Sequence, residues 1–171
     1  DLGTLGKLVI NVANGGGGNA AAVTDHTIAL NCLVYPNHGL HYESVKAREC
    51  GGDVRSKWMS HAHELTDKTV GIIDLGRIGQ QVAMRAKPLL GDNGRLLVYD
   101  TRPDIGELAA RCGVESVDDP MELFQVCDTV SLHVAGDAPI VFYEQLAAMR
   151  PHASLINPSR GNLVNDDDVH L

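Results

Sequence analysis

Residues 69–80, TVGIIDLGRIGQ, constrain the fold of this chain most strongly. A short β-branched apolar run leads into a turn that holds Gly76 and Gly79, and an amphipathic helical pattern follows at once. A strand, a tight turn and a helix in immediate succession are typical of the first unit of an α/β domain. Asp74 stands where a third glycine would complete a GxGxxG pattern, so the use of this turn has to be judged from the rest of the sequence.

Strand and helix patterns alternate from residue 68 onward. Strict alternation predicts an α/β fold of three layers, a doubly wound parallel sheet with helices on both faces. The predicted strands are residues 68–73, 94–100, 128–134 and 153–157, and the predicted helices are residues 77–90, 103–112, 117–127, 139–149 and, at the end of the chain, 166–171.

The N-terminal part has a different pattern. Residues 7–14 predict one more strand, and the NGGGGN run after it predicts a flexible break, because glycine adopts positive φ freely. Residues 20–35 predict a long helix that is apolar almost all round, so we expect it to be buried between two bodies of protein. Asp25 and His26 are its polar exceptions, and a satisfied buried pair or a cap at the helix start is the plainer interpretation of both.

The composition is that of a globular protein, with 44% hydrophobic and 21% charged residues among 171. No apolar run approaches the length of a membrane span, and the first residues lack the features of a signal peptide, so we expect no membrane partner. A formal net charge of -8 argues against a nucleic-acid partner. The cysteines stand far apart without a CxxC pair, which predicts reduced thiols, no metal site and a cytoplasmic protein; they are Cys32, Cys50, Cys112 and Cys127.

Polar side chains follow every predicted strand after residue 68. Because the carboxyl ends of parallel strands meet at one edge, where ligands bind in such sheets, we expect these side chains to share one crevice. Any one of them alone is more ordinary as a structural residue, but their joint occurrence favours a binding site. They are Asp74, Asp100, His133 and, after the last strand, Asn157 with Ser159 and Arg160.

The turn after the first strand has the chemistry of a phosphate loop. A helix N-terminus offers unpaired N–H groups and a partial positive charge, which suit a pyrophosphate. Gly76 lets the backbone approach the phosphates, and Gly79 lets the helix pack closely on the strand. Asp100 ends the next strand, where a carboxylate accepts the adenosine ribose hydroxyls and repels a 2′-phosphate. The sequence therefore predicts a Rossmann-type fold that prefers NAD to NADP.

Asp74 opposes this use of the loop. Two unit charges about 5 Å apart repel by roughly 3 kcal/mol at an effective dielectric near 20, and solvent reduces that value. Alternatively, the side chain turns away and caps the start of the helix. We expect the fold to survive, the affinity for NAD to fall and the turn to be strained, since glycine is preferred there.

Five stretches, taken in order, carry a family resemblance: NAAAVTDHTIAL, ELTDKTVGIIDLGRIGQQVAMRAKPL, VYDTRP, CDTVSLHV and MRPHASLINPSRGNLVNDDDV. They resemble the NAD-dependent D-isomer-specific 2-hydroxyacid dehydrogenases. The resemblance implies an oxidoreductase with two domains, commonly a homodimer, that transfers a hydride between NAD(H) and a small 2-hydroxy or 2-oxo acid. It also divides the chain into residues 1–65, the end of a substrate domain with an interdomain helix and a connection, and residues 66–171, the NAD-binding domain.

The resemblance also implies a role for particular residues. Arg160 resembles the catalytic arginine, whose guanidinium holds the substrate carboxylate and carbonyl and polarises the carbonyl for hydride attack. Asn19 would contact the substrate from the hinge side, although an ordinary structural role is at least as plain for it. The implied cofactor-binding residues are Asp74, Gly76, Arg77, Ile78 and Gly79 at the pyrophosphate, Asp100 at the ribose, His133 along the cofactor, and Pro158, Ser159 and Arg160 at the nicotinamide.

The chain departs from the family pattern at several places. The family has alanine and glutamate at Thr24 and Asp25, glycine at Asp67, and LHVPL where this chain reads LHVAG. Its acid–base histidine and the partner glutamate lie tens of residues past the arginine, whereas this sequence ends 11 residues after Arg160. No general acid can be assigned, and His152 and His170 are the nearest histidines.

Two alternatives to a dehydrogenase stay open. One is a non-catalytic NAD(H)-binding sensor or interaction module on the same fold, and the other is a remnant that has lost both activity and tight binding. Asp74 and the missing acid–base histidine favour these alternatives, whereas Asp100, Ser159 and Arg160 favour the dehydrogenase. The sequence does not name the acid on which the enzyme would act.

Overall fold

The computed structural model describes residues 17–34 and 64–169. Their centre is a five-stranded sheet in the order β3-β2-β1-β4-β5, and all pairings are parallel. The strands are β1 (Thr69–Ile73), β2 (Arg95–Tyr99), β3 (Glu115–Ser116), β4 (Thr129–Leu132) and β5 (Ser154–Ile156). The chain order reverses beside β1, and such a switch point opens a crevice at the carboxyl ends of the strands.

The four predicted strands are confirmed, and one strand was missed. β3 has two residues, both exposed, so it carries no apolar signal that a sequence pattern could detect. It pairs with β2 at the edge of the sheet.

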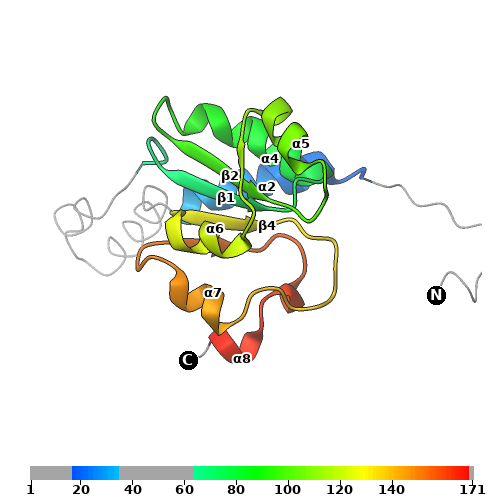
Figure 1. The fold of residues 1–171 in the computed structure, drawn as a ribbon, viewed down its shortest axis with the longest axis vertical. Helices are drawn as coiled ribbons and strands as arrows, with labels where there is room; N and C mark the ends of the chain where they lie inside the picture. The colour runs from blue at the N-terminus through cyan, green and yellow to red at the C-terminus, as the bar shows by residue number, and fades with distance from the viewer. Residues whose placement is uncertain (1–16, 35–63, 170–171) are drawn as a thin grey trace, which may run out of the picture.

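Helices cover both faces of the sheet, as Figure 1 shows, with α2, α4 and α5 on one side and α6, α7 and α8 on the other. The helix predicted over residues 77–90 ends earlier and continues as a 3-10 turn that contains Pro88. The elements are α2 (Ala20–Val34), α4 (Arg77–Ala86), η2 (Lys87–Leu89), α5 (Ile105–Cys112), α6 (Pro120–Val126), α7 (Tyr143–Ala148), η3 (Gly161–Leu163) and α8 (Asp166–Val169).

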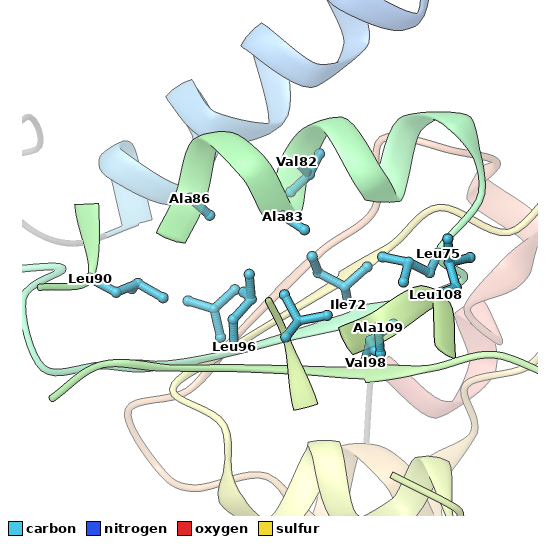
Figure 2. Close-up of a cluster of buried hydrophobic side chains, with 12 residues drawn as sticks. Ile72, Leu75, Val82, Ala83, Ala86, Leu90, Leu96, Val98, Leu108 and Ala109 are labelled. Carbon is cyan, nitrogen blue, oxygen red and sulfur yellow. The ribbon is translucent and has the colours of Figure 1, made fainter. Parts of the chain in front are cut away.

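Alternate strand residues supply two hydrophobic cores, one on each face of the sheet. Ile72, Leu96 and Val98 meet α4 and α5 on one face, and Figure 2 shows Val82, Ala83 and Ala86 of α4 above them. Ile73, Leu97, Val130 and Leu132 point to the other face, where they pack with Leu123 and Phe124 of α6. Because both faces are covered, the three-layer architecture predicted from the alternation is confirmed.

The long N-terminal helix, α2, is only partly buried within the described chain. Ala20, Thr24, Thr27 and Asn31 form its buried face. The Thr24 and Thr27 hydroxyls donate to backbone carbonyls four residues earlier, at 2.7 and 2.8 Å, so these polar side chains pack without an unpaired hydroxyl. The opposite face, which includes Ala21, Ala22 and Ala29, is exposed, so the burial expected on all sides is not found here.

Asp25 and His26 are both exposed on α2. The Asp25 carboxylate lies 3.2 Å from the Arg85 guanidinium of α4, at the surface. Asp25 is therefore neither a member of a buried pair nor a cap at the helix start, and both interpretations are wrong for it. The strand predicted at residues 7–14 and the connection before residue 64 lie outside the described residues.

Candidate functional site

Four strand ends deliver polar side chains to one edge of the sheet. Asp74 follows β1, Asp100 follows β2, His133 follows β4 and Asn157 follows β5. Because β2, β1, β4 and β5 are neighbours in that order, Asp100 and Asn157 are three strand spacings apart, or roughly 14 Å. The edge is therefore long enough for an extended ligand to contact different groups at its two ends.

The loop between β1 and α4 makes a sharp turn at the switch point. Leu75 is fully buried, and Gly76 stands at the N-cap of α4 in an extended conformation. A Cβ atom on Gly79 would lie 2.1 Å from the Asp74 carbonyl oxygen, so only glycine lets α4 pack this closely on the end of β1. Arg77 and Ile78 begin the helix, and their backbone N–H groups belong to its first turn, where the N–H groups point toward the crevice end of the sheet.

Asp74 adopts a left-handed backbone, with φ of 76°. The strained turn expected at this position is therefore present. A Cβ atom on Gly76 would lie 3.0 Å from Asp74 Oδ1, so the Asp74 side chain turns back toward the start of α4. Burial raises the pKa of this carboxyl group, and the nearby Asp100 carboxylate raises it further.

Asp100 is the most heavily bonded carboxylate of the edge, and its side chain is 8% exposed. One oxygen, Oδ2, accepts the Leu75 N–H at 2.9 Å and the Arg102 Nε–H at 3.1 Å. The other, Oδ1, accepts the Arg102 backbone N–H at 3.0 Å. Burial disfavours the charged form, but these donors and the Arg102 charge outweigh it and lower the pKa of Asp100. Asp100 is therefore ionised at neutral pH and tied to the loop between β1 and α4.

A cavity of about 380 Å³ lies next to Asp74 and Asp100. Its walls are mostly apolar and come from three strand ends, α6, α7 and the segment before α7, which suits a flat apolar ring beside a polar ribose. Sequence reasoning missed this cavity, because no local motif marks residues that converge from separate elements. The lining residues are Ile73, Asp74, Tyr99, Asp100, Thr101, Pro120, Phe124, Val134, Ile140 and Gln145.

His133 is buried at the middle of the edge, with 7% of its surface exposed. Its Nε2 lies 3.1 Å from the Ser131 hydroxyl, and its Nδ1 has no hydrogen-bond partner among the described residues. Burial lowers the pKa of His133 to about 4. The imidazole is therefore neutral at physiological pH, so almost none of it carries the proton that a general acid must donate.

The segment after β5 forms a tight polar loop. The Asn157 side chain accepts the Ser159 N–H at 3.1 Å and donates to the Arg160 carbonyl at 2.6 Å, and the Ser159 hydroxyl donates to the Leu132 carbonyl at 2.9 Å. Pro158 is half-buried between them, whereas the Arg160 side chain is exposed and donates to the Ser159 carbonyl at 3.2 Å. The loop thus anchors Ser159 to the end of β4 and leaves the Arg160 guanidinium accessible.

Residues 33–170 match the family described as D-isomer specific 2-hydroxyacid dehydrogenase, NAD binding domain. The chain belongs to this family. Its fold and its NAD-binding character, predicted from the motifs, are thereby confirmed.

Individual dehydrogenases resemble the chain over much of its length. It is 44% identical over 111 residues to D-3-phosphoglycerate dehydrogenase of Methanocaldococcus jannaschii and 29% identical over 163 residues to formate dehydrogenase of Neurospora crassa, and these matches cover 63% and 94% of the chain. An NAD-dependent formate dehydrogenase from Staphylococcus aureus, solved in complex with NAD, aligns with 99% of the chain at a TM-score of 0.78 and 30% identity. The chain spans only 20%, 42% and 49% of the lengths of these three proteins.

The start of α2 lies beside the loop between β1 and α4. Gly17 has φ of 85°, and a Cβ atom there would lie 1.7 Å from the Arg77 guanidinium. Asn19 is exposed in the same turn, just before α2. Asn19 thus lies at the start of α2, the helix that packs against α4. None of its described contacts assigns it to a substrate.

His152 lies at the opposite edge of the dehydrogenase domain from the crevice. Its Nε2 is 3.0 Å from the Asp128 carboxylate, which also accepts the Thr69 N–H at 2.8 Å. Thr69 begins β1 and His152 precedes β5, so this pair belongs to the amino ends of the strands. His152 is therefore not placed to act on a ligand at the crevice, and His170 lies outside the described residues.

Two of the expected absences can be examined in the part of the chain that the structure describes. Within it, no three His, Cys, Asp or Glu side chains are grouped so that they could hold a metal ion. Among the same residues, no helix has both the length and the apolar character to cross a membrane.

Proposed function

We propose that this domain binds NAD(H) along the strand ends and presents Arg160 to a small D-2-hydroxy or 2-oxo acid for hydride transfer. When bound, the nicotinamide supplies or accepts the hydride. The observation that carries the proposal is Asp100, an ionised and nearly buried carboxylate that is held against the phosphate-loop amide of Leu75 beside an apolar cavity.

Each part of the cofactor has a chemically matched group in this proposal. The cavity takes the adenine, and Asp100 accepts hydrogen bonds from its ribose. The first N–H groups of α4, around Gly76, Arg77 and Ile78, bind the pyrophosphate. The nicotinamide lies by Pro158 and Ser159, after the buried imidazole of His133.

Arg160 is the substrate-binding group of the proposal. Its guanidinium is exposed and, among the described residues, donates to the Ser159 carbonyl, which leaves further N–H donors for a carboxylate and an adjacent carbonyl. Stabilising the negative charge that develops on that carbonyl oxygen would lower the barrier for hydride attack. Asn19 would approach the same substrate from the α2 side.

The assembly and the compartment are further parts of the proposal. The exposed outer face of α2 offers small residues that can pack against a second copy, which supports a homodimer. The free thiols of Cys32, Cys112 and Cys127 are in keeping with a reducing cytoplasm. We keep residue 65 as the boundary between the hinge-side region and the NAD-binding domain.

The test is calorimetric titration of the chain with NADH, with Asp100→Asn as the matched variant. Asparagine keeps the size of the side chain but loses its charge and one acceptor, so NADH affinity should fall by about tenfold or more. An unchanged affinity with an intact fold would remove Asp100 from the ribose site.

A second candidate function is a non-catalytic NAD(H) sensor or interaction module on the same fold. It is favoured by His133, the histidine that follows a described strand end, because its buried imidazole is neutral at physiological pH and carries almost no proton to donate. A trace turnover of any candidate 2-oxo acid that is lost in Arg160→Gln would contradict the sensor. A remnant that has lost both activity and cofactor binding would fail to bind NADH even after Asp74→Gly.

A further inference from the structure

Three charged side chains, Asp74, Asp100 and Arg102, meet where β1 and β2 end. Ile73 and Tyr99 are paired neighbours in the sheet, so the aspartates that follow them emerge side by side. Arg102 comes two residues later and folds back over both carboxylates. Its Nε lies 3.1 Å from Asp100 Oδ2, and its Nη2 lies 3.8 Å from Asp74 Oδ1.

The two carboxylates are not equivalent in this cluster. Asp100 is 8% exposed and has donors on both oxygens, whereas Asp74 is 27% exposed and meets Arg102 only at ion-pair distance. The Arg102 guanidinium is therefore anchored by Asp100 and extends its charge toward Asp74. With Arg102 the cluster has a formal charge of one negative unit, and without it two negative units stand beside the N-terminus of α4.

We propose that Arg102 is the positioning residue that lets a phosphate loop with an aspartate bind a dinucleotide. Its guanidinium holds the Asp74 carboxylate on the ribose side of the loop and offsets its charge where the pyrophosphate approaches. This inference rests on the proposed function and extends it to a residue that no sequence motif marks. It also explains how the domain tolerates the Asp74 carboxylate at a position where the GxGxxG pattern has a glycine, which has no side-chain charge.

The proposal makes the effect of Arg102 depend on residue 74. If Arg102 acts by offsetting the Asp74 charge, then its removal should matter when residue 74 is aspartate and matter little when residue 74 is glycine. A purely structural role, for example holding Asp100 against Leu75, would weaken binding equally in both backgrounds. A double-mutant cycle separates these two cases.

The experiment measures NADH affinity by calorimetry for the unmodified chain, Arg102→Gln, Asp74→Gly and the double variant. We expect Arg102→Gln to weaken NADH binding by about tenfold in the unmodified chain and by less than about threefold in the Asp74→Gly background. Arg102→Lys keeps the charge and should stay within about threefold of the unmodified chain. Arg95→Gln is the matched control, since Arg95 pairs with Glu115 near the other end of β2 and should leave affinity unchanged.

The outcomes distinguish this inference from the function on which it rests. Equal losses in the two backgrounds, or no loss from Arg102→Gln, would overturn the role of Arg102 and leave NAD(H) binding standing. Absence of NADH binding in every variant, with Asp74→Gly included and all variants folded by circular dichroism, would overturn both. Removing the Arg102 charge leaves the Asp74 and Asp100 carboxylates uncompensated, so it should weaken the binding of a 2′-phosphate further. If Arg102→Gln instead gains affinity for NADPH relative to NADH, Arg102 does not compensate Asp74.

Discussion

Asp67 and Asp74 bracket β1, and both hold a left-handed backbone, with φ of 63° and 76°. Among the described residues they are the non-glycine positions with positive φ. Both are also positions where the family pattern has glycine. The left-handed conformation costs an ordinary residue about 1–2 kcal/mol, and somewhat less for aspartate, so the two sites carry a similar backbone cost. Of the two, only Asp74 lies at the crevice. Comparing substitutions at both positions therefore separates the effect of backbone strain on NADH affinity from the effect of the Asp74 charge.

Asp74→Gly should tighten NADH binding by about tenfold, because it removes a carboxylate from the start of α4, where the pyrophosphate would bind. Calorimetric titration measures the change. Asp67→Gly is the control: it relieves the same backbone strain at the other end of β1, so it should alter thermal stability without altering affinity. Equal affinities for Asp74→Gly and the unmodified chain would show that this carboxylate does not act on the phosphates.

Asp100 should make the chain prefer NADH to NADPH, because an ionised carboxylate at the ribose repels a 2′-phosphate. Asp100→Ala should therefore narrow the ratio of the two affinities. Titrations with both cofactors, on both chains, give the ratio directly. A chain that binds the two cofactors equally well before the substitution would exclude Asp100 from cofactor selection.

His133 should make the fold sensitive to mild acid. The folded imidazole has a pKa of about 4, lowered by burial, whereas an unfolded histidine titrates near 6.5. Between these values the unfolded chain binds more protons, so stability falls as pH falls from about 6.5 to 4, and this group adds no further loss below that. The difference corresponds to about 3 kcal/mol at 1.4 kcal/mol per pKa unit.

Urea unfolding at several pH values between about 4 and 7.5 measures this slope. His133→Leu should flatten it, and His26→Ala, an exposed histidine of α2, should leave it unchanged. A slope that persists in His133→Leu would assign the acid sensitivity to other groups.

The 171 residues alone should oxidise NADH with pyruvate, glyoxylate, hydroxypyruvate or phosphohydroxypyruvate at no more than a trace rate. General acid catalysis contributes about 10² to 10⁴ in rate, and no described histidine combines the crevice with a suitable pKa. Turnover above about 1 s⁻¹, within the ordinary enzyme range, would contradict this account. His133→Ala would then be the first variant to make, since His152 pairs with Asp128 at the other edge.

The sequence predicted those parts of the site that depend on the period and direction of the strands. Asp74, Asp100, His133 and Asn157 could be placed on one edge because each follows an apolar run in a parallel sheet. The contacts of Arg102 with both aspartates could not be predicted from the strand pattern, since they depend on the conformation in which its long side chain folds back over the strand ends.

Other features depended on long-range packing and were missed for that reason. The cavity beside Asp100 is closed by Pro120, Phe124 and Ile140, which converge from segments with unrelated local patterns. The exposed outer face of α2 was also missed, because a helix that is apolar almost all round does not indicate which of its faces packs against other elements.

The central claim is that the strand ends around Asp100 bind NAD(H), and calorimetric titration with NADH tests it most directly. The account predicts saturable binding at one site per chain, weakened by about tenfold or more in Asp100→Asn and tightened by about tenfold in Asp74→Gly. Circular dichroism of each variant shows that the fold is retained. The account would be contradicted if folded Asp74→Gly protein gave no binding heat with NADH and caused no shift in the fluorescence emission of NADH.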